Sequence, residues 1–206
     1  MSIFLNYGNF KSFIKRCPVT SFFMLVNTVL FILSIIMADF SFSGDKFTEA
    51  LVDLGGLAPV LVFAYKEYYR LLVTLFLHGS VLHYLFNTFF GLMVVCAGLE
   101  KLIGSWRYFL VYIITGLFSS VVVLYTTGDY TLTIGASGAI YGVMGIFLYV
   151  IFFKRHLLSI VDQKYIISLV AINLLFTFLW PSISIVGHLG GLAGGLILAP
   201  LLLIKE

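Results

Sequence analysis

Uncharged stretches of about twenty residues recur along this chain, and they restrict its possible folds more than any other feature. An α-helix of that length crosses the ~30 Å hydrocarbon core of a bilayer. Six such stretches are present, at about 18–38, 71–99, 108–128, 130–153, 165–180 and 183–204. The last two share one uncharged run, which is divided by the breaker Trp180-Pro181-Ser182. We therefore expect six membrane spans, the last two forming a helical hairpin.

The composition agrees with a membrane protein. With 61% hydrophobic and 10% charged residues in 206, the chain has too much apolar surface to bury in a water-soluble globule of this size. Lipid tolerates only helices and closed barrels, and the spans lack the alternating pattern of barrel strands. The first span has a basic flank but no small-residue cleavage site, so it is kept as a helix. We expect an all-α bundle of six transmembrane helices forming a single domain over residues 1–206.

The distribution of Lys and Arg predicts the orientation. If the N-terminus is inside, nine of the twelve basic residues fall on the inner side. They are Lys11, Lys15, Arg16, Lys101, Arg107, Lys154, Arg155, Lys164 and Lys205. The positive-inside rule then places both termini in the cytoplasm, with the bilayer as the chain's surroundings. This topology accounts for the net charge of +3, and no soluble basic patch indicates a nucleic-acid partner.

Two further features concern the outer loop and the cysteines. The loop from Phe40 to Arg70 is too long and too apolar for a plain connector, so we expect it to lie in the membrane interface. Cys17 and Cys96 are too few for a disulfide framework and do not pair with histidines at zinc spacing. The sequence thus predicts no metal and no cofactor.

Strongly polar side chains inside membrane spans are costly and usually functional. The sequence has His78, His83, Asn87, Ser137, Asn173 and His188 within the expected spans. Three of them, His83, Ser137 and His188, each lie seventeen residues before the charged residue at the inner end of their span. At 1.5 Å per residue, all three are predicted roughly 25 Å above the cytoplasmic boundary. Three reactive groups on three helices therefore share one level.

Local spacing supports a shared site. Ser137 and Tyr141 are four residues apart and so lie on one helical face, as do His83 and Asn87. Small-residue stripes occur on the fourth and sixth spans, at Gly138, Gly142 and Gly145 and at Gly187, Gly191 and Gly195. Such stripes allow two helix backbones to approach closely. Packing through them would bring Ser137 within hydrogen-bonding range of His188.

Each of these residues also has an ordinary structural explanation. A serine among glycines is more often a packing residue, Asn87 could join two helices, and Tyr141 could be core. An intramembrane histidine could instead line the path of a small transporter or proton channel. That hypothesis predicts inverted repeats and a charged pathway, and the sequence has neither. A catalytic site is favoured because Ser137, His83 and His188 share one depth and Asn87 lies on the same helical face as His83.

Taken together, the motifs resemble those of the rhomboid intramembrane serine proteases over almost the whole chain. "GASGAIYGVMG" resembles the family's G-x-S-G motif, with Gly135, Ser137 and Gly138 at the matching positions. "GHLGGLAGG" resembles H-x-x-G-x-x-x-G, with His188, Gly191 and Gly195. "HGSVLHYLFN" resembles the motif of the second span, with His83 and Asn87. One departure is Tyr69-Arg70, where the family usually has Trp-Arg.

The resemblance implies a catalytic Ser137–His188 dyad, since the fourth to sixth spans have no carboxylate at that depth. A serine needs such a base to become a useful nucleophile. The implied oxyanion donors are His83, Asn87 and the Ser137 backbone N–H. Tyr141 resembles the tyrosine that stacks on the base. We assign His78 to holding the outer loop, and Glu100 to fixing the inner end of the second span.

The resemblance also implies a bacterial plasma-membrane protease that cleaves transmembrane segments of other proteins near their outer end. Helix-destabilising Gly or Pro in the substrate would favour cleavage. Substrates are expected to reach the site between the second and fifth spans, under a lid at Trp180–Ser184. The alternative is a non-proteolytic, client-binding relative, which should lack the serine or the histidine, yet both are present.

Overall fold

Helices and the turns between them make up the part of the chain that the computed structural model describes, residues 2–4 and 8–202. An isolated antiparallel bridge joins Leu57 and Thr133. In chain order the elements are α1 (Phe10–Arg16), α2 (Pro18–Met37), α3 (Asp45–Asp53), α4 (Pro59–Tyr65), α5 (Arg70–Val73), η1 (Thr74–Phe76), α6 (Val81–Leu85), η2 (Phe86–Cys96), α7 (Ala97–Ile103), α8 (Ser105–Thr126), α9 (Ser137–Phe153), η3 (Arg155–Leu157), α10 (Ile160–Leu179) and α11 (Ile185–Leu202).

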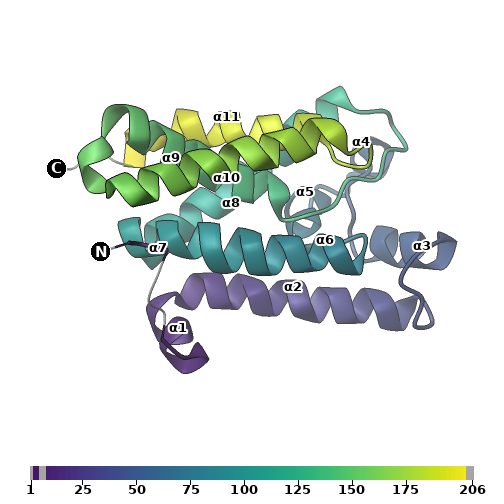
Figure 1. Cartoon of the computed structure of the whole chain (residues 1–206). Helices are drawn as coiled ribbons and strands as arrows, with labels where there is room; N and C mark the ends of the chain where they lie inside the picture. The colour runs from purple at the N-terminus through teal and green to yellow at the C-terminus, as the bar shows by residue number, and fades with distance from the viewer. Residues whose placement is uncertain (1, 5–7, 203–206) are drawn as a thin grey trace.

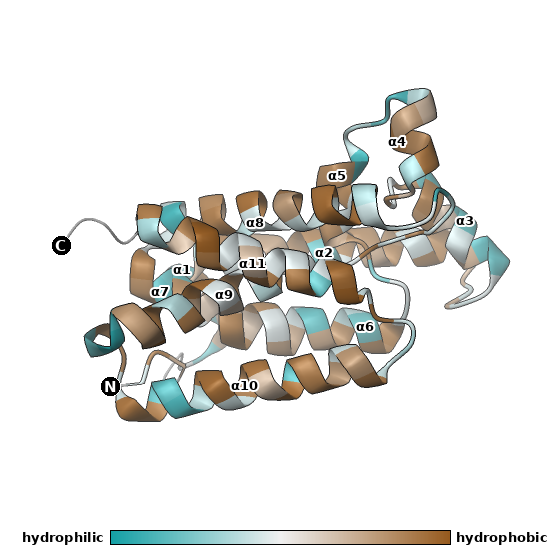
Figure 2. Cartoon of the chain, turned by 90° about the horizontal axis from the view of Figure 1, so that it is seen from above, coloured by the Kyte–Doolittle hydropathy of each residue, from teal (hydrophilic) through white to brown (hydrophobic). Residues whose placement is uncertain are grey.

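The long helices run side by side as a bundle. The short helices α3 and α4 gather at one end of it, and α1 and α7 lie at the other (Figure 1). In the described chain, four helices are long and apolar enough to cross a membrane: α2, the continuous run Val81–Ile103, α8 and α10. α9 and α11 are shorter apolar helices. Apolar residues cover much of the outside of the long helices (Figure 2), as expected of a multi-pass membrane protein.

The expected first span is confirmed, because 18–38 corresponds to α2 (Pro18–Met37). The expected second span is wrong at its N-terminal end, since its helix begins at Val81 instead of residue 71. Ser80 caps this helix by accepting a hydrogen bond from the backbone N–H of His83 at 3.1 Å. His78 therefore lies in the turn before the helix. The hydropathy pattern alone does not reveal such a helix cap.

The fourth expected span, 130–153, is also too long at its N-terminal end, because α9 begins at Ser137. Gly135 has φ +130°, a conformation that helices exclude and that glycine adopts readily. Before it, Thr133 exchanges backbone hydrogen bonds with Leu57, and Thr74 Oγ1 donates to the Thr133 carbonyl at 2.6 Å. The segment before Ser137 is thus extended chain pinned to the outer loop.

The last two expected spans correspond to two helices joined by a short turn, as a helical hairpin requires. α10 and α11 are separated by residues 180–184, and Ser184 Oγ accepts from the Gly187 N–H at 3.1 Å, at the start of α11. α10 begins at Ile160, earlier than the expected 165, because the Ser159 hydroxyl caps it through the Asp162 N–H at 3.1 Å. The last two residues of the expected span 183–204 lie outside the described chain.

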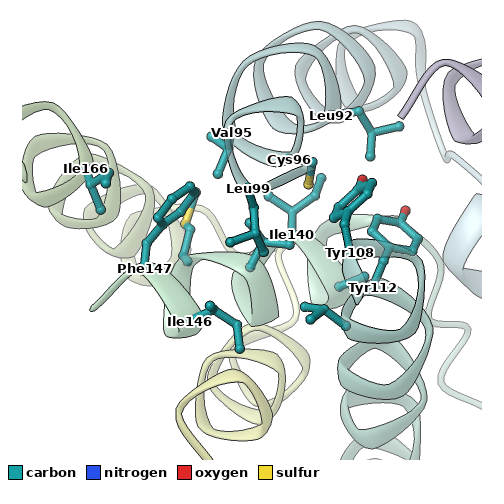
Figure 3. Close-up of a cluster of buried hydrophobic side chains, with 14 of the residues drawn as sticks. Leu92, Val95, Cys96, Leu99, Tyr108, Tyr112, Ile140, Ile146, Phe147 and Ile166 are labelled. Carbon is teal, nitrogen blue, oxygen red and sulfur yellow. The ribbon is translucent and has the colours of Figure 1, made fainter. Parts of the chain in front are cut away.

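The core lies around α9, where most side chains are buried. Figure 3 shows Ile140, Ile146 and Phe147 of α9 among apolar residues of the second span, α8 and α10. On the other side, α9 meets α11 backbone to backbone. A Cβ added to Gly191 would overlap the carbonyl oxygen of Gly138, and one on Gly195 would overlap that of Gly142. The glycine stripes therefore pack against each other, as the sequence predicted.

Glu100, near the C-terminal end of the helical run 81–103, contacts the N-terminal end of α2. Its buried carboxylate accepts hydrogen bonds from the backbone N–H groups of Val19 and Thr20, at 3.0 and 2.8 Å. These are among the first N–H groups of α2, which lack partners within their own helix. Glu100 thus holds the C-terminal end of the second expected span against α2, the end that the sequence analysis assigned to it.

Candidate active site

Ser137 is the first residue of α9 and is partly exposed. The first backbone N–H groups of a helix have no partner within the helix and attract negative charge. Ser137 therefore places its hydroxyl and its own N–H at the same helix terminus. The sequence predicted a serine within a helix, whereas the observed terminus adds an anion-binding element that hydropathy did not indicate.

His83 lies close to Ser137 across Gly135. A Cβ placed on Gly135 would lie 2.8 Å from Nε2 of His83 and 3.5 Å from Oγ of Ser137. The absence of a side chain at Gly135 thus leaves room for both groups. The backbone N–H of Gly79 donates to Nδ1 of His83 at 3.3 Å. Because Nδ1 accepts, the proton of a neutral His83 ring is on Nε2, the atom next to Gly135.

His188 lies in the first turns of α11 and is buried. Its ring stacks on that of Tyr141, with centroids 4.0 Å apart and planes inclined by 19°. Tyr141 is one turn along α9 from Ser137, on the same face. Nδ1 of His188 lies 2.7 Å from Oγ1 of Thr177 on α10. The glycine stripes were expected to bring Ser137 within hydrogen-bonding range of His188, but in the described chain no hydrogen bond joins Ser137 Oγ to His188. Nε2 is the ring nitrogen of His188 left open.

Asn87 and His78 complete the second-span side of the site. Asn87 is buried, and its Nδ2 donates to the carbonyl of His83 at 2.9 Å, which leaves its second amide hydrogen. It is the second residue of the π-helical segment η2, a geometry often found at functional sites. His78 is fully buried beside His83 and Tyr84, with ring centroids 5.2 and 5.7 Å away. Neither ring nitrogen of His78 has a hydrogen-bond partner in the described chain.

Three further polar residues, two of them named in the sequence analysis, have supporting roles. Asn173 Nδ2 donates to the Leu169 carbonyl at 2.8 Å within α10, so it does not reach Ser137 through that group. Ser119 Oγ on α8 donates to the Gly187 carbonyl at 2.7 Å, which holds the start of α11. Arg70 Nη1 donates to the carbonyls of Val52 and Gly56, and so fixes the outer loop.

Thr177 is a site residue that the sequence analysis missed. It contacts both Tyr141 and His188, yet it lies on α10, eleven residues before the histidine. No spacing within one helix relates it to Ser137 or His188. In the sequence, Thr177 is only a hydroxyl residue within an uncharged span, and such residues are common in membrane helices.

Comparisons with known proteins agree with these motifs. The sequence model of the rhomboid domain matches residues 65–205. The chain is 30% identical to YdcA of Bacillus subtilis, a protein assigned to the rhomboid proteases, over 99% of this chain and 98% of YdcA. It is 37% identical to the rhomboid protease GluP of the same organism, over 74% of this chain and 29% of GluP. It is 32% identical to inactive rhomboid protein 1 of Bos taurus, over 71% of this chain and 17% of that protein.

Proposed function

The chain belongs to the rhomboid family, and on that premise we propose that it is an intramembrane serine endopeptidase with Ser137 as nucleophile and His188 as general base. One observation carries the proposal: Ser137 begins α9 one turn from Tyr141, on which His188 stacks, while Nε2 of His83 approaches Gly135. A serine hydroxyl, a buried imidazole and an oriented N–H donor near the start of one helix support this assignment.

In the proposed reaction, Oγ of Ser137 attacks the scissile carbonyl carbon while Nε2 of His188 takes the hydroxyl proton. The tetrahedral intermediate collapses when His188 returns that proton to the leaving amine, which breaks the C–N bond and leaves an acyl-enzyme. A water molecule, deprotonated by His188, then attacks the ester carbonyl. The second tetrahedral intermediate collapses when His188 gives that proton to Oγ of Ser137, which breaks the ester C–O bond, releases the acid product and restores the Ser137 hydroxyl.

The oxyanion that forms in both steps needs donors placed in advance. We assign this role to Nε2–H of His83, to Nδ2 of Asn87 and to the backbone N–H of Ser137. The Gly79–His83 hydrogen bond supports the assignment, because it leaves the proton of His83 on the nitrogen nearest Gly135. The positive end of α9 adds to the same stabilisation.

For the membrane arrangement, we propose six spans formed by α2, residues 81–103, α8, α9, α10 and α11, with both termini cytoplasmic. The excess of Lys and Arg on one side supports this orientation. α9 rises about 25 Å over its length, so Ser137 would lie near the outer boundary of the hydrocarbon core. The chain would then act in the bacterial plasma membrane.

Transmembrane segments of other proteins are the proposed substrates, reaching Ser137 between residues 81–103 and α10, under the segment 180–184. α10 lies at the edge of the bundle (Figure 2). Phe86 and Phe90 on one helix and Phe176 on the other are exposed. Apolar side chains here suit a segment arriving from lipid.

Cleavage of a reconstituted transmembrane substrate tests the proposed function. Wild-type protein in liposomes should cleave it, and Ser137→Ala should abolish cleavage at an unchanged folded yield. Ser168→Ala, a change on the exposed face of α10, is the matched control and should cleave like wild type. The alternative is a client-binding protein without catalysis, since one similar protein is an inactive rhomboid. Substrate binding by wild type without any cleavage would favour that alternative.

A further inference from the structure

The hydroxyl of Thr177 meets three polar groups from three helices. Thr177 is buried on α10, with 1% of its surface exposed. Its Oγ1 lies 2.9 Å from the Asn173 carbonyl on its own helix, 2.5 Å from the Tyr141 hydroxyl on α9 and 2.7 Å from Nδ1 of His188 on α11. The exposed outer face of α10 has no part in this junction.

The protons at this junction can be counted. A threonine hydroxyl has one hydrogen to donate and two lone pairs to accept with. The Asn173 carbonyl can only accept, so the hydrogen of Thr177 goes there. Tyr141 and His188 must then both donate to Thr177. The ring proton of neutral His188 is therefore on Nδ1, and Nε2 carries the lone pair.

From this count we infer that Thr177 is a positioning residue, which fixes the tautomer and the orientation of the proposed base. The inference rests on the proposed function of His188. Stacking on Tyr141 sets the plane of the imidazole, and the hydrogen bond to Thr177 sets its rotation within that plane. A base that takes a proton through Nε2 needs its Nδ1 protonated and held, a role that a carboxylate fills in Ser-His-Asp proteases.

The opposite proton arrangement would disable the site. If Thr177 donated to Nδ1 instead, the proton of neutral His188 would be on Nε2, and that nitrogen could not accept a proton from serine. In the inferred arrangement the only hydrogen of Thr177 goes to the Asn173 carbonyl, so it is not donated to Nδ1. Because Thr177 lies on α10 and His188 on α11, the base is oriented correctly only while these two helices are packed together.

Three variants test the inference in the full-length protein. Thr177→Val removes the hydroxyl at nearly constant volume, and Thr177→Ser keeps it. Thr115→Val is the matched control, because Thr115 is equally buried but donates only to the Val111 carbonyl within α8. We expect Thr177→Val to lower kcat about 10- to 100-fold, the range known for groups that orient metal-ligating histidines, with little change in KM. Thr177→Ser and Thr115→Val should retain kcat close to wild type.

Nitrogen chemical shifts of the His188 ring in isotope-labelled protein give a readout that a packing role would not change. Wild type should have its proton on Nδ1, and Thr177→Val should lose this preference. A wild-type proton on Nε2 would overturn the inference even if Thr177→Val did not fold. Unchanged kcat in Thr177→Val, or an equal loss in Thr115→Val, would also overturn it. Full cleavage by Ser137→Ala would instead refute the proposed function itself.

Discussion

The ring of His188 lies against that of Tyr141 with 4.0 Å between centroids, and the two residues come from different helices. The contact depends on the close approach of α9 and α11, which the glycines permit. It places the proposed base one helical turn from Ser137. The position of the proposed base therefore depends on the backbone packing of α9 against α11.

Tyr141 should act mainly through its ring. Tyr141→Phe keeps the stacking surface and loses the hydroxyl bonded to Thr177, so we expect a moderate loss of kcat. Tyr141→Ala removes the surface as well, leaves a cavity costing about 3–5 kcal/mol of stability, and should be nearly inactive. Cleavage rates and thermal unfolding of both variants check this. Equal kcat for the two would contradict an orienting role of the ring.

His83 and Asn87 are predicted to act on the transition state. Loss of one oxyanion donor typically lowers kcat by about 10²- to 10³-fold, so His83→Ala and Asn87→Ala should be impaired yet measurable. The loss of kcat in His83→Ala should be at least as large as in Asn87→Ala, because Nε2 of His83 lies nearest Gly135. Slow fluorophosphonate labelling should survive in both, since Ser137 and His188 remain.

The kinetic parameter affected decides between roles for this pair. A loss confined to KM would mean that His83 and Asn87 bind substrate and transition state equally, and the oxyanion assignment would be wrong. If Asn87→Ala were as inactive as Ser137→Ala and also unfolded earlier, Asn87 would instead join helices through its bond to the His83 carbonyl.

Gly191 should tolerate no side chain. The Cβ of Gly191→Ala would overlap the Gly138 carbonyl and force α9 and α11 apart, at a cost of about 1–3 kcal/mol. Gly128→Ala is the matched control, because its Cβ would meet only Thr131 at 3.4 Å. Thermal unfolding in detergent and the labelling rate of Ser137 measure the two effects. Wild-type values for Gly191→Ala would disprove the tight packing.

Glu100 is predicted to support the fold without taking part in the chemistry. Glu100→Ala leaves the N–H groups of Val19 and Thr20 without their acceptor, so stability should fall by about 1–3 kcal/mol. The kcat of the protein that remains folded should match wild type, measured per active site by titration with a fluorophosphonate. A specific loss of kcat would make Glu100 part of the catalytic machinery.

The sequence allowed the helices and most of the proposed site to be predicted, because charge-free length and motif spacing are local properties. The limits of α2 were predicted almost to the residue. The outer ends near Val81 and Ser137 were not, since a serine cap and the positive φ of Gly135 determine them. Thr177 could not be predicted at all, because its contacts depend on how α10 packs against α9 and α11.

The central claim is that Ser137 is a nucleophile activated by His188. The most direct measurement is peptide mass spectrometry of the protein after reaction with a fluorophosphonate in detergent or liposomes. The account predicts one phosphonyl adduct, on Ser137, absent from Ser137→Ala and strongly reduced in His188→Ala. The double variant Ser137→Ala/His188→Ala should cleave no more slowly than either single variant, because the two groups act as a unit. An adduct on another serine, or undiminished labelling of Ser137→Ala, would contradict it.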